Sequence, residues 1–399
     1  MAAIQIRDVR VFLTAPDDQN LVAVRVDTTE PGLYGLGCAT LAYRAFAVKD
    51  VVERSLKPLL LGRDVSRVQD LWNLMMQNAY WRNGPVLNNA VSGVDMALWD
   101  IKAKAAGMPL FDLLGGKCRD RVDVYRHCNA ASKQQVLELA QQAVDSGCKY
   151  IRAAYTAYDG PGEGGYLCLA NQCKVYDPGL HRKNIVDLLE ALRVRFGDAI
   201  ALMTDTHERL SAQDAVKLAK ALEPLDLLFM EDPVAPEQKE WLARIRQVCA
   251  TPLAMGELLC TPAEWMPLVE GRLIDYLRCH LSAMGGLTPA RKAAVVAEAY
   301  GVQTAWHGSL DMTPIAMAVQ THLDYATPNF GIQEYYGYGP HTAEVFLGSP
   351  VYRDGALWLH EAPGHGVDFD EKAAACFPPH DKPTRWTEMR LPDGTLHTP

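Results

Sequence analysis

The sequence predicts an α/β protein in which a β/α barrel follows a smaller α+β unit. Strand and helix patterns alternate from about residue 121 onward, whereas the preceding residues show two strands followed by helices. Three acidic residues also recur at equal intervals, each after a short apolar run. Alternation of strands and helices indicates a parallel sheet with right-handed crossovers, and about eight such strands favour closure into a barrel.

Residues 1–120 form the predicted α+β unit. Alternating apolar residues predict strands over 4–13 and 21–28, and Pro31-Gly32 supplies a turn after the second strand. Apolar residues at helical spacing then predict three helices. These helices cover 45–61, 66–80 and 86–106.

Residues 121–340 form the predicted barrel. We expect its strands over 122–127, 150–154, 200–204, 227–231, 253–256, 274–277, 303–305 and 330–333. Helices are predicted between them, for example over 133–146, 181–195 and 212–222. The Gly-rich segment 155–178 is too long for a plain turn, and such segments commonly act as active-site lids. Residues 341–399 are rich in Pro and Gly, and we expect them to pack back onto the first unit.

Composition and charge narrow the classes of partner. The 399 residues are 49% hydrophobic and 22% charged, as in an ordinary globular protein. A net charge of −9 argues against nucleic acid, because binding its backbone requires a basic face. The sequence shows neither a signal pattern nor an apolar run long enough to span a bilayer. Its ten cysteines form no C-x-x-C pair, which favours reduced thiols and a cytoplasmic location.

The regularly spaced acids are Asp205, Glu231 and Glu257, which are 26 residues apart (231 − 205 and 257 − 231). One strand, one helix and two turns occupy about that length, so each carboxylate is expected at the C-terminal end of a parallel strand. Surface acids at chance intervals are the alternative interpretation. Three carboxylates brought together repel each other unless a cation lies between them, and oxygen ligands favour a hard ion such as Mg²⁺.

Further polar residues lie at the predicted strand ends. His207 follows Asp205 by two residues, so it is a candidate metal ligand or general acid. Arg152 ends the second strand, where its charge can bind a substrate carboxylate or stabilise a tyrosinate. The lid offers Tyr155, Tyr158, Tyr166 and Tyr176 as candidate bases, although on sequence alone a packing role is the favoured interpretation for each.

The remaining strand ends also carry polar side chains. His307 and Asp311 have the spacing of an oriented imidazole–carboxylate pair. His127, Arg278 and Glu334 follow the first, sixth and eighth strands. Each alone could be structural, but their common position around one barrel end favours a shared cavity.

Longer motifs carry a resemblance to a known family. They are YWRNGP (80–85), VDMALWDIKAK (94–104), PNFGIQEY (328–335) and GHGVD (364–368), together with Glu231-Asp232 and Gly256-Glu257. On these motifs, nearly the whole chain resembles the enolase superfamily and, within it, the mannonate dehydratase group. The resemblance implies an N-terminal α+β capping domain on a modified (β/α)₇β barrel of the TIM type. It also implies a homo-oligomer, either a tetramer or an octamer.

The resemblance further implies a mechanism. Mg²⁺ would be held by Asp205, Glu231 and Glu257, where it would stabilise the charge formed when a proton α to a carboxylate is removed. A hydroxyl would then leave the next carbon. Arg152 and Tyr166 would act as the base and His207 as the acid. Residues at substrate-contact positions would be His127, Arg278, His307, Asp311 and Glu334.

The chain departs from the group outside these residues. Ala42 stands where the group has a substrate-binding Asn, the Trp-rich C-terminus is replaced, and the lid spacing differs. We therefore expect a Mg²⁺-dependent dehydratase that converts an acid sugar, such as mannonate or gluconate, to a 2-keto-3-deoxy acid. One alternative is a racemase, but no Lys-x-Lys follows the second strand. The other alternative is a non-catalytic protein that binds or senses a metabolite.

Overall fold

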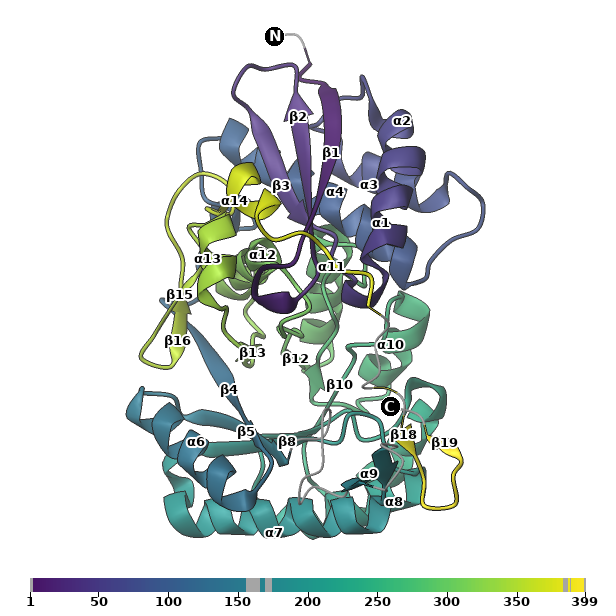
Figure 1. Ribbon diagram of the computed structural model, residues 1–399, viewed down its shortest axis with the longest axis vertical. Coiled ribbons are helices and arrows are strands. Elements are labelled where there is room, and N and C mark those ends of the chain that lie inside the picture. The colour runs from purple at the N-terminus through teal and green to yellow at the C-terminus, as the bar shows by residue number, and fades with distance from the viewer. Residues whose placement is uncertain (1–2, 156–165, 169–173, 383–386, 388, 398–399) are drawn as a thin grey trace.

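The small N-terminal unit lies at one end of the barrel, which it covers as a cap (Figure 1). This computed structural model describes all residues except 1–2, 156–165, 169–173, 383–386, 388 and 398–399. The side chains of 155, 166–168 and 174 are also outside the description. No helix in the described part of the chain is both long and apolar enough to cross a membrane.

The cap contains a three-stranded antiparallel sheet, of which the third strand was not predicted. The strands are β1 (Ile6–Thr14), β2 (Leu21–Thr28) and β3 (Tyr34–Cys38), in that order. β3 carries Gly35 and Gly37, which lower its strand propensity. A Cβ on either glycine would lie 2.0 Å from a carbonyl oxygen of the helix beneath, at Ala97 or Gly93. Close helix packing therefore requires these glycines, and tertiary contacts stabilise the strand.

The predicted cap helices are confirmed. They are α1 (Ala45–Val51), α2 (Lys57–Leu60), α3 (Val68–Gln77) and α4 (Pro85–Ala105), and one π-helical turn, Val52–Leu56, joins α1 to α2. Val91, Val94 and Leu98 of α4 are buried against Val24 and Val26 of β2 in the core of the cap. A short helix, α5 (Leu110–Leu113), leads to the barrel.

The barrel consists of parallel strands that pair in chain order. They are β4 (Val122–Ala130), β5 (Tyr150–Tyr155), β8 (Ala201–Asp205), β9 (Phe229–Glu231), β10 (Leu253–Met255), β11 (Tyr276–Leu277), β12 (Gln303–Thr304) and β13 (Gln333–Glu334). β13 pairs with β4, and a bridge between Thr304 and Phe330 joins β12 to the segment that enters β13. These contacts close the barrel.

One helix lies between each pair of successive barrel strands. These helices are α6 (Lys133–Asp145), α7 (Pro178–Phe196), α8 (Ala212–Leu222), α9 (Leu242–Val248), α10 (Pro262–Glu270), α11 (Leu287–Ala299) and α12 (Pro314–Ala326). The expected capped (β/α)₇β architecture is therefore confirmed.

The segment predicted as a lid includes a hairpin that the sequence did not indicate. β6 (Tyr166–Cys168) and β7 (Lys174–Tyr176) pair antiparallel between β5 and α7. β7 also pairs with β18 (Met389–Arg390), which pairs with β19 (Leu396–His397). The chain end therefore extends the sheet that begins in the lid.

The described residues after 341 contact both units. α13 (Pro340–Val345), α14 (Glu371–Ala375), β14 (Phe346–Leu347) and β17 (Asp368–Phe369) lie near the cap. The carboxylate of Glu371 pairs with Arg10 of β1 at 2.8 Å. The hairpin β15 (Val351–Arg353) and β16 (Ala356–Trp358) instead pairs with β4 of the barrel. The residue limits proposed for the three units stay a prediction.

A buried carboxylate joins the cap to the barrel. Asp95 of α4 accepts hydrogen bonds from the backbone N–H (2.9 Å) and hydroxyl (2.6 Å) of Thr288, at the start of α11. Gly286 precedes this helix at φ 105°, and a Cβ there would lie 2.5 Å from the Asp95 carboxylate. Only glycine fits this close approach. Burial raises the pKa of Asp95 to about 7, although the bonds from Thr288 oppose that shift.

We expect Asp95→Asn to change how stability depends on pH. The pKa of Asp95 is higher in the folded protein (about 7) than its ordinary value of 3.8, so the folded state binds this proton more tightly. Its contribution is therefore present at low pH and is lost as the pH rises through 7. Relative to the variant, the wild type should lose about 2–4 kcal/mol between pH 4 and pH 8. Guanidinium denaturation at several pH values measures this, and a pH-independent difference would contradict it.

Candidate active site

Two layers of side chains fill the barrel interior, and strand alternation generates both. The lower layer is apolar and consists of Tyr125, Met203, Phe229, Ala254, Tyr276, Ala305 and Ile332. Residues i and i+2 of a strand point to the same side, so a second layer lies two residues further along. This polar layer contains His127, Asp205, Glu231, Arg278, His307 and Glu334. It lies at the C-terminal ends of the strands, the barrel mouth, where the cap meets the barrel.

Two buried arginines connect the carboxylates at the mouth. Arg152 pairs with Glu231 and, at 3.1 Å, with Asp205. Arg278 pairs with Glu231 at 2.9 Å and also contacts Glu257 and Glu334. Burial alone would lower the pKa of each guanidinium, but these carboxylates raise it well above its ordinary value. Both arginines are therefore permanent positive charges that link the strands.

The carboxyl groups at the mouth fall into two electrostatic classes. Glu257 and Glu334 have a pKa well below the ordinary value, because Arg278 and His307 outweigh the effect of burial. Glu231 and Asp232 have a raised pKa, because burial and neighbouring carboxylates outweigh the same arginine. In this second class the nearby arginines do not outweigh burial and like charge, and a bound cation would supply further positive charge.

The structure offers one oxygen cluster that fits such a cation. Carboxylate oxygens of Asp205, Glu231 and Asp232 lie within 4.8 Å of one another. Oδ2 of Asp232 accepts no hydrogen bond among the described residues, whereas Oδ1 accepts one from the backbone N–H of Gly256 at 3.2 Å. Oδ2 lies 3.6 Å from a nitrogen of Arg278. A buried all-oxygen set of this kind suits a hard divalent ion.

Glu257, the third predicted ligand, lies outside this cluster. The register of β9 and β10 places Ala254 beside Glu231, so Glu257 lies three residues further along, in the loop after β10. Its carboxylate faces Arg278, His307 at 3.2 Å and His207 at 3.6 Å. Equal spacing in the sequence therefore does not place the three acids at equal depth, and the ligand set stays a prediction.

The predicted His–Asp pair is present at the mouth. His307 Nε2–H donates to Asp311 Oδ1 at 2.9 Å, while Nδ1 lies 3.2 Å from Glu257 and 3.3 Å from Glu334. Burial disfavours a charged imidazole here, but the three carboxylates outweigh it and raise the pKa of His307 well above 6.5. We therefore expect this ring to be positively charged at neutral pH.

His127 of β4 contacts the same glutamate, Glu334, as His307 does. Its Nδ1 lies 3.0 Å from a nitrogen of Arg152, and its Nε2 lies 2.8 Å from Glu334. Burial and the charge of Arg152 lower the pKa of His127 to about 4, despite the attraction of Glu334. The ring is therefore neutral at neutral pH and can accept the Arg152 N–H through Nδ1.

His207 lies in the turn after β8. Its backbone N–H donates to Asp205 Oδ1 at 2.6 Å, and its φ of 49° turns the chain sharply out of the strand. The imidazole Nε2 lies 3.6 Å from Glu257. Burial lowers the pKa of His207, while Asp205 and Glu257 oppose that shift. His207 thus contacts two of the predicted metal ligands, Asp205 through its backbone and Glu257 through its ring.

The lid tyrosines are described only in part. The backbone of Tyr166 pairs with that of Tyr176 across β6 and β7, but the Tyr166 side chain lies outside the described residues. Tyr155 has no described side chain either, and Tyr158 is outside the description altogether. Tyr176 is buried and stacks on His397, with ring centroids 4.9 Å apart. The position of a lid base therefore stays a prediction.

Three residues of the site were not predicted from the sequence. The hydroxyl of Tyr125 donates to Glu231 and accepts from Nε of Arg278, both at 3.2 Å. Asp232 joins the oxygen cluster, and the ring of His280 stacks on that of His307. Tyr125 lies two residues from His127 and His280 lies two residues from Arg278, so strand alternation was the available signal.

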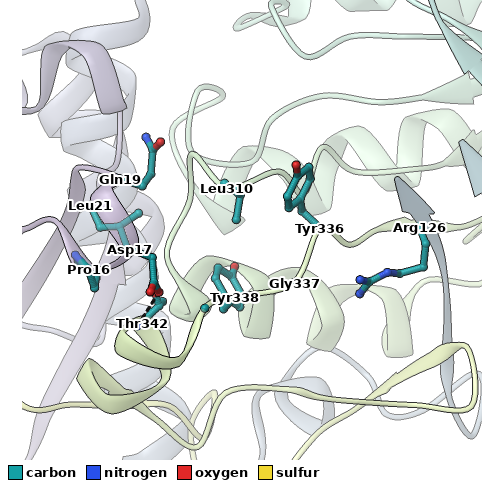
Figure 2. A pocket seen from close by; sticks show the side chains of 11 residues that line it. Pro16, Asp17, Gln19, Leu21, Arg126, Leu310, Tyr336, Gly337, Tyr338 and Thr342 are labelled. Atoms are coloured by element: carbon teal, nitrogen blue, oxygen red, sulfur yellow. Dashed lines mark hydrogen bonds between the residues drawn. The ribbon is translucent and has the colours of Figure 1, made fainter. Parts of the chain in front are cut away.

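A pocket of about 340 Å³ lies where the cap meets the barrel (Figure 2). Asp17 of the cap accepts hydrogen bonds from the backbone N–H (2.9 Å) and the hydroxyl (2.7 Å) of Thr342, which closes one side. Arg126 lines the opposite side in Figure 2. Tyr336 lines it between them and contacts the ring of His127 at 4.8 Å between centroids. The pocket therefore adjoins the polar layer.

Both parts of the chain match known family models. Residues 2–115 match the N-terminal domain of mandelate racemase and muconate lactonizing enzyme. Residues 135–373 match the enolase C-terminal domain-like family. The second match covers more than half of the chain and includes every polar residue of the site except His127 and Tyr125.

Curated relatives match over the full length. A D-galactonate dehydratase family member from Enterococcus gallinarum is 50% identical over 401 residues, which cover 100% of both chains. A member of the same family from Pantoea ananatis is 44% identical over 417 residues, again with 100% of both chains covered.

Solved structures agree with these relatives. A crystal structure of an enolase from Pantoea ananatis, with bound D-gluconate and Mg, has a TM-score of 0.95 at 43% identity and covers 99% of this chain and 100% of that chain. A member of the enolase superfamily from Salmonella Typhimurium has a TM-score of 0.84 at 25% identity, covering 94% and 98%. The chain therefore belongs to the enolase superfamily and, within it, to the D-galactonate dehydratase family.

Proposed function

We propose that this protein is a Mg²⁺-dependent dehydratase that converts a six-carbon aldonate to a 2-keto-3-deoxy acid. The observation that carries the proposal is the barrel mouth, where clustered carboxylates, two buried arginines and imidazole groups lie in contact. An anionic sugar acid and a divalent cation together would balance these charges. Support also comes from the Pantoea ananatis enolase, which binds D-gluconate and Mg and is 43% identical to this chain. Mannonate and gluconate are the first substrates to test, followed by galactonate.

Asp205, Glu231 and Glu257 are the proposed metal ligands. Asp232 has the proposed role of orienting the loop of Glu257, because it accepts the hydrogen bond from Gly256. When bound, Mg²⁺ would stabilise the negative charge that develops on the substrate carboxylate after loss of the C2 proton.

The protein's own groups would transfer the protons. Arg152 and Tyr166 are the proposed base at C2, since the positive charge of Arg152 would favour a tyrosinate. His207 is the proposed acid that protonates the leaving C3 hydroxyl. Burial lowers its pKa, which makes the charged imidazole a stronger acid.

The other polar residues are proposed to orient the substrate. Arg278 carries a permanent charge and His307 is protonated, so both suit anionic or hydroxyl groups. Asp311 and Glu334 would accept hydrogen bonds from sugar hydroxyls, and His127 could accept or donate one. The oligomer size and the cytoplasmic location stay predictions.

We expect the purified protein to form a 2-keto-3-deoxy acid from at least one aldonate when Mg²⁺ is present. Mannonate, gluconate and galactonate would be incubated with the protein, and the product would be detected as a semicarbazone. EDTA should abolish the reaction, because the ligands then lack their cation. Glu231→Gln serves as the blank. No keto acid from any aldonate would contradict the proposal.

We expect the ligand set to be resolved by Mg²⁺ titration of two variants. Glu257→Gln should weaken Mg²⁺ binding by about 100-fold or more, because it removes a direct ligand. Asp232→Asn should weaken binding by about 10-fold, because it affects only the loop that carries Glu257. Isothermal titration measures both affinities without turnover. The reverse order of effects would make Asp232 the ligand.

We expect His207→Asn to separate the two proton transfers. In D₂O, the variant should still exchange the C2 hydrogen of the substrate, because Arg152 and Tyr166 are intact. Dehydration should fall by about 10²–10⁴-fold, because the acid for the C3 hydroxyl is missing. NMR of recovered substrate and product measures both rates. In the wild type, binding of aldonate without any C2 exchange would instead support the non-catalytic alternative.

A further inference from the structure

A second group of possible ligand atoms lies at the barrel mouth. His280, His307 and Asp311 each offer an atom within 4.8 Å of the others. Two imidazoles and a carboxylate are a set that transition metals favour. The hydrogen bonds of His280 decide whether this set binds a metal or serves another purpose.

The turn around His280 determines where its proton lies. His280 Nδ1 accepts hydrogen bonds from the backbone N–H groups of Ser282 (3.1 Å) and Ala283 (3.3 Å). A ring nitrogen that accepts carries no proton, so the neutral ring is protonated at Nε2. Burial lowers the pKa of His280 to about 4, despite the nearby Asp311, which keeps the ring neutral at neutral pH. An Nε2–H group is a donor and is not available as a metal ligand.

The Nε2–H group of His280 faces Asp311. Nε2 lies 3.7 Å from Asp311 Oδ2, while the other oxygen, Oδ1, accepts from His307 Nε2–H at 2.9 Å. The rings of His280 and His307 are stacked, with centroids 4.8 Å apart and an angle of 22° between their planes. Two nearly parallel imidazoles thus face the two oxygens of one carboxylate.

This arrangement restrains a side chain that would otherwise be mobile. The Asp311 side chain is 40% exposed, whereas that of His307 is 9% exposed. Without His280, Oδ2 would face solvent, and rotation of the carboxylate would release its hydrogen bond to His307. The orientation of His307 therefore depends on His280 through Asp311.

His280 is itself held by the cap. The turn that contains it is closed by a hydrogen bond from the backbone N–H of Met284 to the carbonyl of His280 at 3.0 Å. Asn88 of α4 donates to the carbonyl of Ala283 in the same turn at 2.9 Å. The buried turn thus places the His280 ring by contacts with both units of the fold.

We propose that His280 is a positioning residue, which holds Asp311 so that the imidazole of His307 faces Glu257, Glu334 and the substrate. The effect on substrate rests on the proposed function, whereas the arrangement of the three side chains does not. The group His280–Asp311–His307 thus acts as one unit, in which His307 donates to Asp311 and the Nε2–H of His280 faces the other carboxylate oxygen, and it binds no metal of its own.

The first test is the protonation state of the rings. In ¹⁵N-labelled protein without substrate, we expect NMR to show His280 with a proton on Nε2 and none on Nδ1, at neutral pH. A proton on Nδ1 would overturn the proposal. Addition of one equivalent of Zn²⁺ would also overturn the proposal if it shifted the His280 and His307 resonances together, and by the same amount in Glu231→Gln protein. That result would assign a metal to this group rather than to the proposed Mg²⁺ site.

The second test uses a set of matched variants. His280→Asn keeps an oxygen that can accept from Ser282 but loses the ring and the Nε2–H group, whereas His280→Gln places an amide N–H nearer to Asp311. In His280→Asn, the Nε2 proton of His307 should exchange with water at least about tenfold faster, and His280→Gln should restore part of this protection. The exposed His360 provides the control His360→Asn, which should leave the exchange unchanged.

The third test is a double-mutant cycle with Asp311→Asn. If His280 acts through Asp311, then His280→Asn should lower kcat about tenfold when introduced alone. The same substitution should have little further effect on kcat when Asp311→Asn is already present. Full additivity would overturn the proposal. The NMR experiments require no turnover, so they decide this inference even if no aldonate is dehydrated. An active wild type with unaltered His307 exchange in His280→Asn would reject this inference and leave the proposed function standing.

Discussion

The excess of buried carboxylate over guanidinium at the barrel mouth is the constraint on which the site depends. Asp205, Glu231 and Asp232 share a small volume, and within the described part of the chain Arg152 and Arg278 are the permanent positive charges that contact them. Burying several like charges together is costly, so a cation and an anionic ligand would make the arrangement more favourable. Folding therefore builds a site that is electrostatically incomplete. The free energy that stabilises the closed barrel and the cap core has to offset this cost.

The cap contributes to the site by holding the ends of the barrel strands. Asp95 and Trp99 both bind Thr288, and Trp72 donates to the carbonyl of Gly285 at 2.9 Å. These contacts and that of Asn88 all reach the turn between β11 and α11. The same turn carries His280 and follows Arg278, so the cap positions charged groups that it does not itself contain. This coupling explains why glycine is required at Gly286, where cap and barrel approach most closely.

Sequence patterns predicted most of the barrel because its elements repeat. Asp205 and Glu231 were found from spacing, and they are adjacent partners in the register of β8 and β9. Glu257 has the same spacing but lies deeper into its loop, since the register of β9 and β10 pairs Glu231 with Ala254. β3 was missed because glycine disfavours a strand locally, although helix packing requires it. The hairpin β6–β7 was missed because its stability depends partly on β18, more than 200 residues away.

The sequence by itself determined the fold class, the polar residue at each strand end and the excess of acid, because these follow from local periodicity and residue type. Only the tertiary structure decided which oxygens come within reach of one cation, which carboxyl groups Arg278 neutralises and how His280 is protonated. Those properties depend on strand register, burial and backbone contacts between distant segments. None of them has a signature in the spacing of residues along one chain.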